Sequence, residues 1–205
     1  VETILGFDPQ LKDNDVFGNT ELFVRQLYRD LLWREGEADG IDYWTGQLQQ
    51  GALDRAQVIA FFFGTEEFQT QAGALARLYE GALGRAPDAC GLDYWMGRLV
   101  EGMRFEDITH VFVDSGEFQA RYDTQNTPAL VETLYQDVLG RSPTAEEAAT
   151  WVSRLDGEGS DPADLLWSLV DSAEDRVQSA ETVALDLFYL GLLDRAPDAE
   201  GYAYW

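Results

Sequence analysis

The sequence predicts an all-α protein made of tandem helical repeats of about 51–56 residues, each with three to four helices, stacked side by side. Three observations predict this class. One motif recurs four times in register, the apolar residues of each copy keep the spacing of amphipathic helices, and glycine and proline mark a turn between two helices. We expect neighbouring repeats to bury their apolar faces against one another.

The repeated motif places a Tyr sixteen residues before a Trp in every copy, and an Arg six residues after that Tyr. Successive Tyr residues are 51, 56 and 54 positions apart, so length varies between the motifs and not within them. The three residue types recur as Tyr28, Arg34 and Trp44; Tyr79, Arg85 and Trp95; Tyr135, Arg141 and Trp151; and Tyr189, Arg195 and Trp205. The predicted organisation is a linker over 1–20, repeats over 21–71, 72–122 and 123–181, and the first half of a fourth repeat over 182–205.

The first half of each copy is predicted to form two helices joined by a tight turn. Apolar residues before the turn of the second copy fall at i, i+3, i+4, i+7 and i+8, an amphipathic stripe: Leu75, Leu78, Tyr79, Ala82 and Leu83. Gly84 follows them, where a left-handed cap is easiest for glycine. Pro87 suits the first turn of the next helix, because its missing N–H costs nothing there, and Asp88 complements the positive helix end.

The second half of each copy is predicted to add a helix and then a short one. Apolar residues from 58 to 62 keep helical spacing, and Thr65, Ser115 and Ser172 each suit the N-cap of the following short helix. The AFFF run at 60–63 has the composition of a strand, but its flanks are helical. We therefore predict a buried helix there.

The repeated residues are interpreted as packing residues. Each Trp lies on the apolar stripe of its helix, so burial explains it more simply than stacking on a sugar or cofactor. Each Arg follows a helix end and precedes an acid of the next helix, such as Glu37, Asp88 or Asp198. The guanidinium can therefore bond the free carbonyls of the helix end and pair with that acid.

The third copy departs from the motif at two positions. Gly91 costs stability in a helix interior, so we expect a close backbone crossing there, and Gly40 and Gly201 hold the same place. The third copy has Glu147 at this position and Thr150 where the others have a Tyr. The crossing is expected to be looser in this copy.

A second Tyr directly precedes the Trp in three copies, as Tyr43, Tyr94 and Tyr204. It lies one helical step from the apolar stripe, so we expect it to be partly exposed. These three side chains are the candidate binding residues.

Charge excludes several partners. The chain has 14 basic and 38 acidic residues, a net charge of −24, so nucleic acid and anionic membrane surfaces are poor partners. No apolar stretch is long enough for membrane insertion. Such a surface suits a saline or calcium-containing medium, although solubility alone explains it equally well.

Catalytic residues are not predicted. His110 is the only histidine, with Glu106 and Asp114 one turn away, and neither a second histidine nor a nucleophile motif accompanies it. Cys90 is the only cysteine and stands where other copies have acids. The sequence predicts no cofactor.

One segment resembles a calcium loop in part. Within residues 12–23, the side chains of Asp13, Asp15, Asn19 and Glu21 imitate ligand positions, but Phe17 and Val24 stand where two further oxygen ligands belong. The alternative is a linker that ends in a helix cap at Asn19 or Thr20. Calcium binding by other acidic loops stays open.

The motif L-Y-x-x-x-L-G-R-x-P-D-x-x-G-L-x-Y-W, carried by Leu78 to Trp95, resembles a bacterial repeat family of unknown function. That family consists of short helical modules in large exported proteins, beside calcium-binding RTX repeats or in surface-layer-like and adhesin-like chains. Part of the motif is distantly similar to the helical domain of phycobilisome linkers. The resemblance implies export and scaffolding, and no activity is attached to the module.

Two functions are therefore expected as alternatives. The first is a non-catalytic structural or interaction module of an exported bacterial protein, at the cell surface or in an extracellular assembly, which contacts a protein, a glycan or further repeats. The second is an extracellular module whose acidic loops bind calcium to drive folding or assembly. Because the fourth copy stops at Trp205, we also expect more chain or another subunit to cover its apolar stripe.

Overall fold

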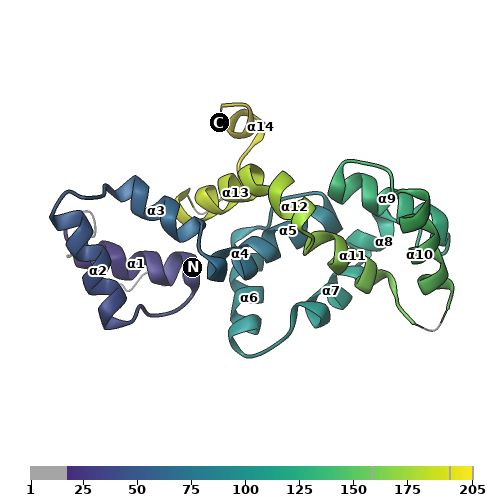
Figure 1. Ribbon diagram of the computed structural model, residues 1–205, viewed down its shortest axis with the longest axis horizontal. Helices are drawn as coiled ribbons and strands as arrows, with labels where there is room; N and C mark the ends of the chain where they lie inside the picture. Colours follow the sequence, from purple (N-terminus) through teal and green to yellow (C-terminus); the bar gives the residue numbers. More distant parts are fainter. Residues whose placement is uncertain (1–17, 158, 194, 205) are drawn as a thin grey trace.

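The computed structural model describes residues 18–157, 159–193 and 195–204, and all regular secondary structure in these residues is helical. The helices form an elongated molecule (Figure 1). In chain order they are α1 (Thr20–Leu32), α2 (Ala38–Gln49), α3 (Arg55–Phe63), α4 (Glu66–Thr70), α5 (Ala72–Leu83), α6 (Ala89–Val100), α7 (Phe105–Val113), α8 (Gly116–Arg121), α9 (Thr127–Leu139), α10 (Ala145–Asp156), α11 (Pro162–Val170), α12 (Ala173–Gln178), α13 (Ala180–Leu193) and α14 (Ala199–Tyr204). The all-α repeat prediction is confirmed.

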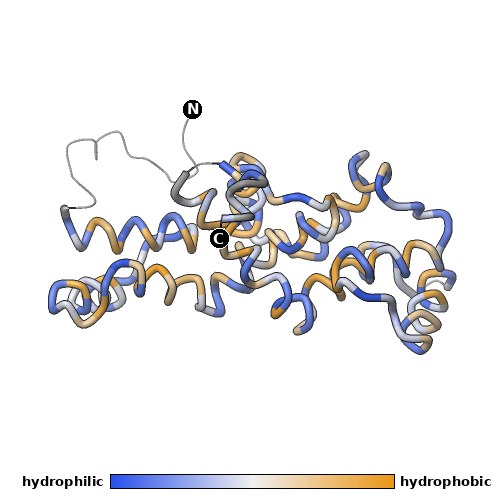
Figure 2. The backbone as a smooth tube through the Cα atoms, turned by 90° about the horizontal axis from the view of Figure 1, so that it is seen from above, coloured by the Kyte–Doolittle hydropathy of each residue, from blue (hydrophilic) through white to orange (hydrophobic). Residues whose placement is uncertain are grey.

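The first three copies each contribute four helices: α1–α4, α5–α8 and α9–α12. Within a copy, two longer helices are followed by a nine-residue helix and a short fourth one, and α13 and α14 are the first two helices of the fourth copy. Hydrophobic and hydrophilic residues alternate along the helices, as amphipathic packing requires (Figure 2).

Local sequence explains where the helices begin and end. The predicted N-caps are confirmed, because the hydroxyls of Thr65, Ser115 and Ser172 each accept a backbone N–H of the following short helix. Gly84 ends α5 in the left-handed conformation with φ 67°, also as predicted. Trp33 takes that conformation at the end of α1, and its indole donates to Asp93 at 3.1 Å, joining the first copy to α6.

Two sequence predictions were wrong in detail. Pro87 does not lie in the first turn of α6 but before its N-cap, because the Asp88 carboxylate accepts the Gly91 N–H and makes Asp88 the cap. The AFFF run is helical, but it is not fully buried. Its Phe61 is 54% exposed, because α3 turns that side chain away from the core.

Helix α5 lies at the centre of the fold and packs against α4, α6, α7, α8, α9, α11 and α13. Small residues allow this crowding: a Cβ on Gly81 would stand 3.0 Å from Val170 and 3.1 Å from Val138. The buried Arg77 donates to the carbonyl oxygens of Val170 at 3.2 Å and Gln69 at 2.9 Å. The Arg77 guanidinium therefore provides hydrogen-bond donors for carbonyl oxygens at the C-terminal ends of α4 and α11, which lack partners within their own helices.

The copies are interleaved more than a simple stack would require. Helix α13 of the fourth copy packs along α5 of the second, and α11 of the third packs along α7 of the second (Figure 1). The longest and most apolar helices of the described ranges still fall short of what crossing a bilayer demands.

Candidate functional site

The repeated residues assemble into the same cluster in every copy. The Tyr of the first helix is buried, and the Arg of the following turn lies over its ring. The guanidinium carbon is 5.2–5.4 Å from the ring centroid in the pairs Arg34/Tyr28, Arg85/Tyr79, Arg141/Tyr135 and Arg195/Tyr189. Such a contact is a cation–π interaction. We call this Tyr/Arg pair the turn cluster, together with the glycine of the second helix where a copy has one and the Trp where it is described.

Glycine at the second-helix position makes room for the Tyr hydroxyl. A Cβ on Gly40 would overlap the hydroxyl of Tyr28, and Gly91 stands in the same relation to Tyr79. The predicted close approach is therefore present, but its partner is a side chain and not a crossing backbone. Burial raises the pKa of Tyr79, so its hydroxyl stays protonated beside Gly91.

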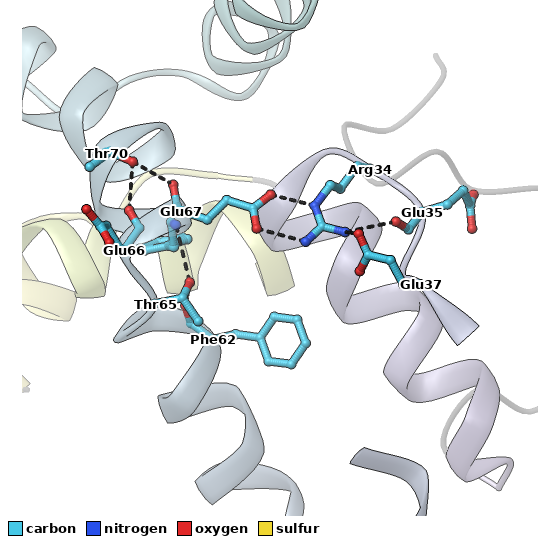
Figure 3. Close-up of polar contacts among 9 residues, drawn as sticks. Arg34, Glu35, Glu37, Phe62, Thr65, Glu66, Glu67 and Thr70 are labelled. Carbon is cyan, nitrogen blue, oxygen red and sulfur yellow. Dashed lines mark hydrogen bonds and ion pairs between the residues drawn. The ribbon is translucent and has the colours of Figure 1, made fainter. Parts of the chain in front are cut away.

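In the first three copies the arginine also joins the two halves of its copy. Arg34 Nε and Nη2 donate to the two carboxylate oxygens of Glu67 at 2.5 and 2.8 Å, across 33 residues of sequence (Figure 3). Arg85 binds Glu117 in the same way at 2.7 and 3.2 Å, and Arg141 binds Glu174 at 2.7 and 2.9 Å. Bidentate pairing of this kind fixes orientation as well as charge.

The arginines meet their predicted partners only in part. Arg34 pairs with Glu37 at 2.8 Å, and Arg195 with Asp198 at 3.1 Å, as expected, while Arg85 lies 3.7 Å from Asp88. Arg34, Arg85 and Arg141 each donate to a carbonyl oxygen within the turn, on Glu35 in the first copy, and not at the helix end.

The glutamate partners were missed from the sequence. A signal for them existed, because Glu67, Glu117 and Glu174 each stand two residues after the Ser or Thr that caps the fourth helix. Acids are common in the first turn of a helix, because they complement its positive end, so one such residue alone does not indicate an arginine partner. Because a glutamate recurs at this same position in three copies, the sequence pattern indicates a specific partner for it, which the structure shows to be the repeated arginine.

The third copy replaces the glycine by a further ion pair. Glu147 accepts two hydrogen bonds from Arg141, both at 3.0 Å, and its side chain also accepts the Thr144 backbone N–H. These bonds, the arginine first, lower the pKa of Glu147 to about 2. The sequence difference is therefore compensated by charge, and Arg141 is held between two carboxylates.

The tryptophans are half-buried and pack against the core without being enclosed by it. The packing repeats closely: the Trp44 centroid lies 5.7 Å from that of Phe62, and Trp95 lies 5.6 Å from Phe112. Trp151 takes the same half-buried position, and Trp205 lies outside the described residues.

The candidate binding tyrosines are on the surface. Tyr43 is 56% exposed and Tyr94 is 59% exposed, and each ring meets the neighbouring Trp edge-on with centroids 4.9 Å apart. Tyr204 is exposed as well. Phe61 and Val111, at equivalent positions of α3 and α7, are exposed on the next helix of each copy.

A buried acid pair lies where α13 meets α5. Asp186 is fully buried, accepts the Tyr202 hydroxyl and shares a hydrogen bond with Glu80. Burial, with the neighbouring Asp186 charge, raises the pKa of Glu80 to about 7, and burial raises the pKa of Asp186. A cavity of about 830 Å³ adjoins the pair, between the turns that carry Arg85 and Arg195.

The metal candidates do not converge within the described residues. Asn19 caps α1 by accepting two backbone N–H groups, and Glu21 pairs with Arg25 at 2.8 Å. Asp13 and Asp15 lie outside the described residues. Within the described ranges, no three His, Cys, Asp or Glu side chains gather as a metal site would need.

Cys90 is exposed, and His110 lies 3.4 Å from Asp161, across the α7–α11 contact.

One family model matches three successive segments of the chain, in agreement with the repeat. The family described as Domain of unknown function (DUF4214) matches residues 14–72, 75–122 and 109–179, so the chain belongs to this family. No curated protein and no solved structure matches the chain.

Proposed function

We propose that this chain is a non-catalytic structural and interaction module of an exported bacterial protein. Its turn clusters hold a helical scaffold together, and the surface around Tyr43 and Tyr94 binds a protein partner at the cell surface or in an extracellular assembly. The family to which the chain belongs is one of unknown function.

The motif's charged groups are already occupied. Arg34, Arg85 and Arg141 each bind a glutamate of the same copy with two hydrogen bonds and cover a Tyr ring. A catalytic arginine or glutamate must present its charge to a substrate. These groups instead face one another, which supports a structural role for the repeated polar residues.

The observation that carries the proposal is the difference between the copies at the surface. The third copy keeps the buried Tyr, the Arg and the Trp but has Thr150 in place of Tyr43 or Tyr94, and Ser168 in place of Phe61 or Val111. The fold therefore forms without exposed apolar groups at these places. Their presence in the first two copies supports a role in binding.

Several features favour a protein partner over a glycan. Tyr43 and Phe61 flank the half-buried Trp44, and aromatic side chains of this kind are typical of the centres of protein interfaces. The surrounding chain carries a net charge of −24, so a partner with basic residues around an apolar centre is complementary to it. Export is proposed from the resemblance and suits this acidic surface.

The test compares the chain with a variant carrying both Tyr43→Ser and Tyr94→Ser. Proteins of the bacterial surface and culture medium are passed over each immobilised chain, and the identified partner is then titrated in purified form. We expect the double variant to lose most of the affinity while its melting temperature is unchanged. The control Val177→Ser, at another exposed apolar position on α12, should bind normally.

Two results would oppose the proposal. Equal binding of the partner to the double variant would show that the tyrosines do not contribute. Saturable binding on a glycan array, lost in the double variant, would replace the protein partner by a carbohydrate.

A further inference from the structure

We infer that α3 is a self-association surface, on which α3 of a second copy of this chain packs as α7 and α11 pack within the chain. The surface consists of Ala56, Ile59, Ala60, Phe63 and Gly64, which share one side of the helix. It is separate from the tyrosine surface of the proposed function, because Phe61 points to a different side of α3.

Helix α3 is apolar around most of its circumference. Val58 and Phe62 are buried against the rest of the first copy, whereas Ile59 and Phe63 on the other side are only half-buried. Ala60 is exposed. A helix that is apolar on all sides is normally covered on all sides.

Helix α3 differs from the other described helices in its lack of acidic residues. It contains no Asp or Glu, whereas every other helix in the described ranges has at least one, in a chain with 38 acidic residues. The contrast with α7 is specific: Ala56, Ala60 and Gly64 stand where α7 has Glu106, His110 and Asp114. The corresponding side of α7 carries exposed charged residues at its edge, and that of α3 carries none.

The pair formed by α7 and α11 shows how such a face is covered. Both are third helices of their copies, and together they form the most extensive helix pair of the described residues. The ring of Phe105 stacks on Trp167, with centroids 4.9 Å apart and planes inclined by 10°. Thr109 and Val113, the counterparts of Ile59 and Phe63, are buried as a result.

Within the described ranges, α3 has no third helix of another copy beside it. Its main neighbours are α1 and α4 of its own copy, and Ile59 and Phe63 also border a small cavity of about 30 Å³ toward α1 and α13, which leaves Ala56, Ala60 and Gly64 as the exposed part of the face. Toward α13 it leaves an apolar groove of about 540 Å³ whose walls include Phe63, Leu185 and Phe188. The larger apolar side chains of the α3 face therefore have less cover than the smaller ones of α7.

A second copy of this chain is the occupant that these observations favour. Inside the molecule the third helix α7 pairs with the third helix α11, so pairing α3 with α3 repeats a kind of contact that the fold already makes. The two faces are then identical and related by a two-fold axis, the commonest arrangement of homodimers. The absence of acids on α3 lets two chains of charge −24 approach at this point.

Sedimentation equilibrium of the whole chain over a wide concentration range tests the inference. We expect a monomer–dimer equilibrium whose dissociation constant rises about a hundredfold or more in Ala60→Glu, because two like charges meet across the axis. Val177→Glu adds the same charge on exposed α12 and should leave the constant unchanged. A strictly monomeric wild type, or a dimer that Ala60→Glu does not weaken, overturns the inference.

A cross-linking experiment covers the case in which Ala60→Glu does not fold. In a Cys90→Ser background, Ala60→Cys places two thiols near the axis, within the reach of a disulfide. We expect it to form a covalent dimer on oxidation much faster than Val177→Cys does. Equal rates would contradict the inference. Unchanged dimerisation in the variant with Tyr43→Ser and Tyr94→Ser would keep this result independent of the proposed function.

Discussion

Arg34 and Glu67 are 33 residues apart in sequence and are joined by two hydrogen bonds, at 2.5 and 2.8 Å, with the guanidinium also lying over the ring of Tyr28. The pair ties the turn between α1 and α2 to the start of α4. Equivalent pairs in the second and third copies do the same. The repeated arginine is therefore best understood as the link between the two halves of a copy.

Replacing Glu67 tests this link directly. Glu67→Gln removes the charge of the bidentate partner, and because both side chains are only about one-third exposed, we expect a loss of about 1 kcal/mol of unfolding free energy. Glu66→Gln is the matched control, since Glu66 also lies in the first turn of α4 and both lose the same helix-dipole interaction. Chemical denaturation of both variants should separate them, and equal losses would argue against the link.

The close approach of the Tyr79 hydroxyl to Gly91 gives a second prediction. Gly91→Ala forces the new methyl group against the Tyr79 hydroxyl, and we expect a loss of about 1–3 kcal/mol of stability. Gly97→Ala lies in the same helix with open space around it, so it should be neutral or stabilising by up to about 1 kcal/mol.

A double variant identifies the clash. Tyr79→Phe removes the hydroxyl that the methyl group meets, so adding it to Gly91→Ala should recover part of the loss measured by thermal denaturation. An additive loss in the double variant would mean that the hydroxyl is not the obstacle.

The acid pair of Glu80 and Asp186 predicts a pH dependence. The pKa of Glu80 is raised from its ordinary 4.5 to about 7, so its contribution to stability is present below pH 4.5 and is lost as the pH rises through 7. Glu80→Gln should therefore flatten the fall in unfolding free energy between pH 4.5 and 7. Burial raises the pKa of Asp175 to about 7 as well, so a smaller slope should remain.

Urea denaturation at a series of pH values measures this effect. The groups that face Glu80 are Asp186 of α13, Tyr202 of α14 and, from longer range, Arg121 and Arg85. A variant profile parallel to that of the wild type would show that Glu80 does not titrate in this window.

Calcium is expected to act on this chain as a screening ion, because the chain carries a net charge of −24. Thermal melts in calcium chloride and in sodium chloride of matched ionic strength should shift by the same amount. A saturable additional shift with calcium would instead favour the cation-responsive module. Asp13→Asn combined with Asp15→Asn would then test whether the N-terminal segment is responsible.

Much of the fold could be predicted from the sequence, because its signals are local. The left-handed cap at Gly84 and the hydroxyl cap at Thr65 each follow from one residue and its neighbours in the chain. The partnership of Arg34 with Glu67 could not be derived in this way, since it depends on how two halves of a copy fold back on each other. The same limit applies to Glu80 and Asp186, which belong to different copies and are not repeated.

The turn cluster is expected to stabilise the fold, whereas the exposed tyrosine is not. The most direct test is the melting temperature of Arg34→Gln beside that of Tyr43→Ser, two substitutions within one copy of the motif. We predict a clear decrease for Arg34→Gln and no change for Tyr43→Ser. A stable Arg34→Gln variant, together with a destabilised Tyr43→Ser variant, would contradict the claim.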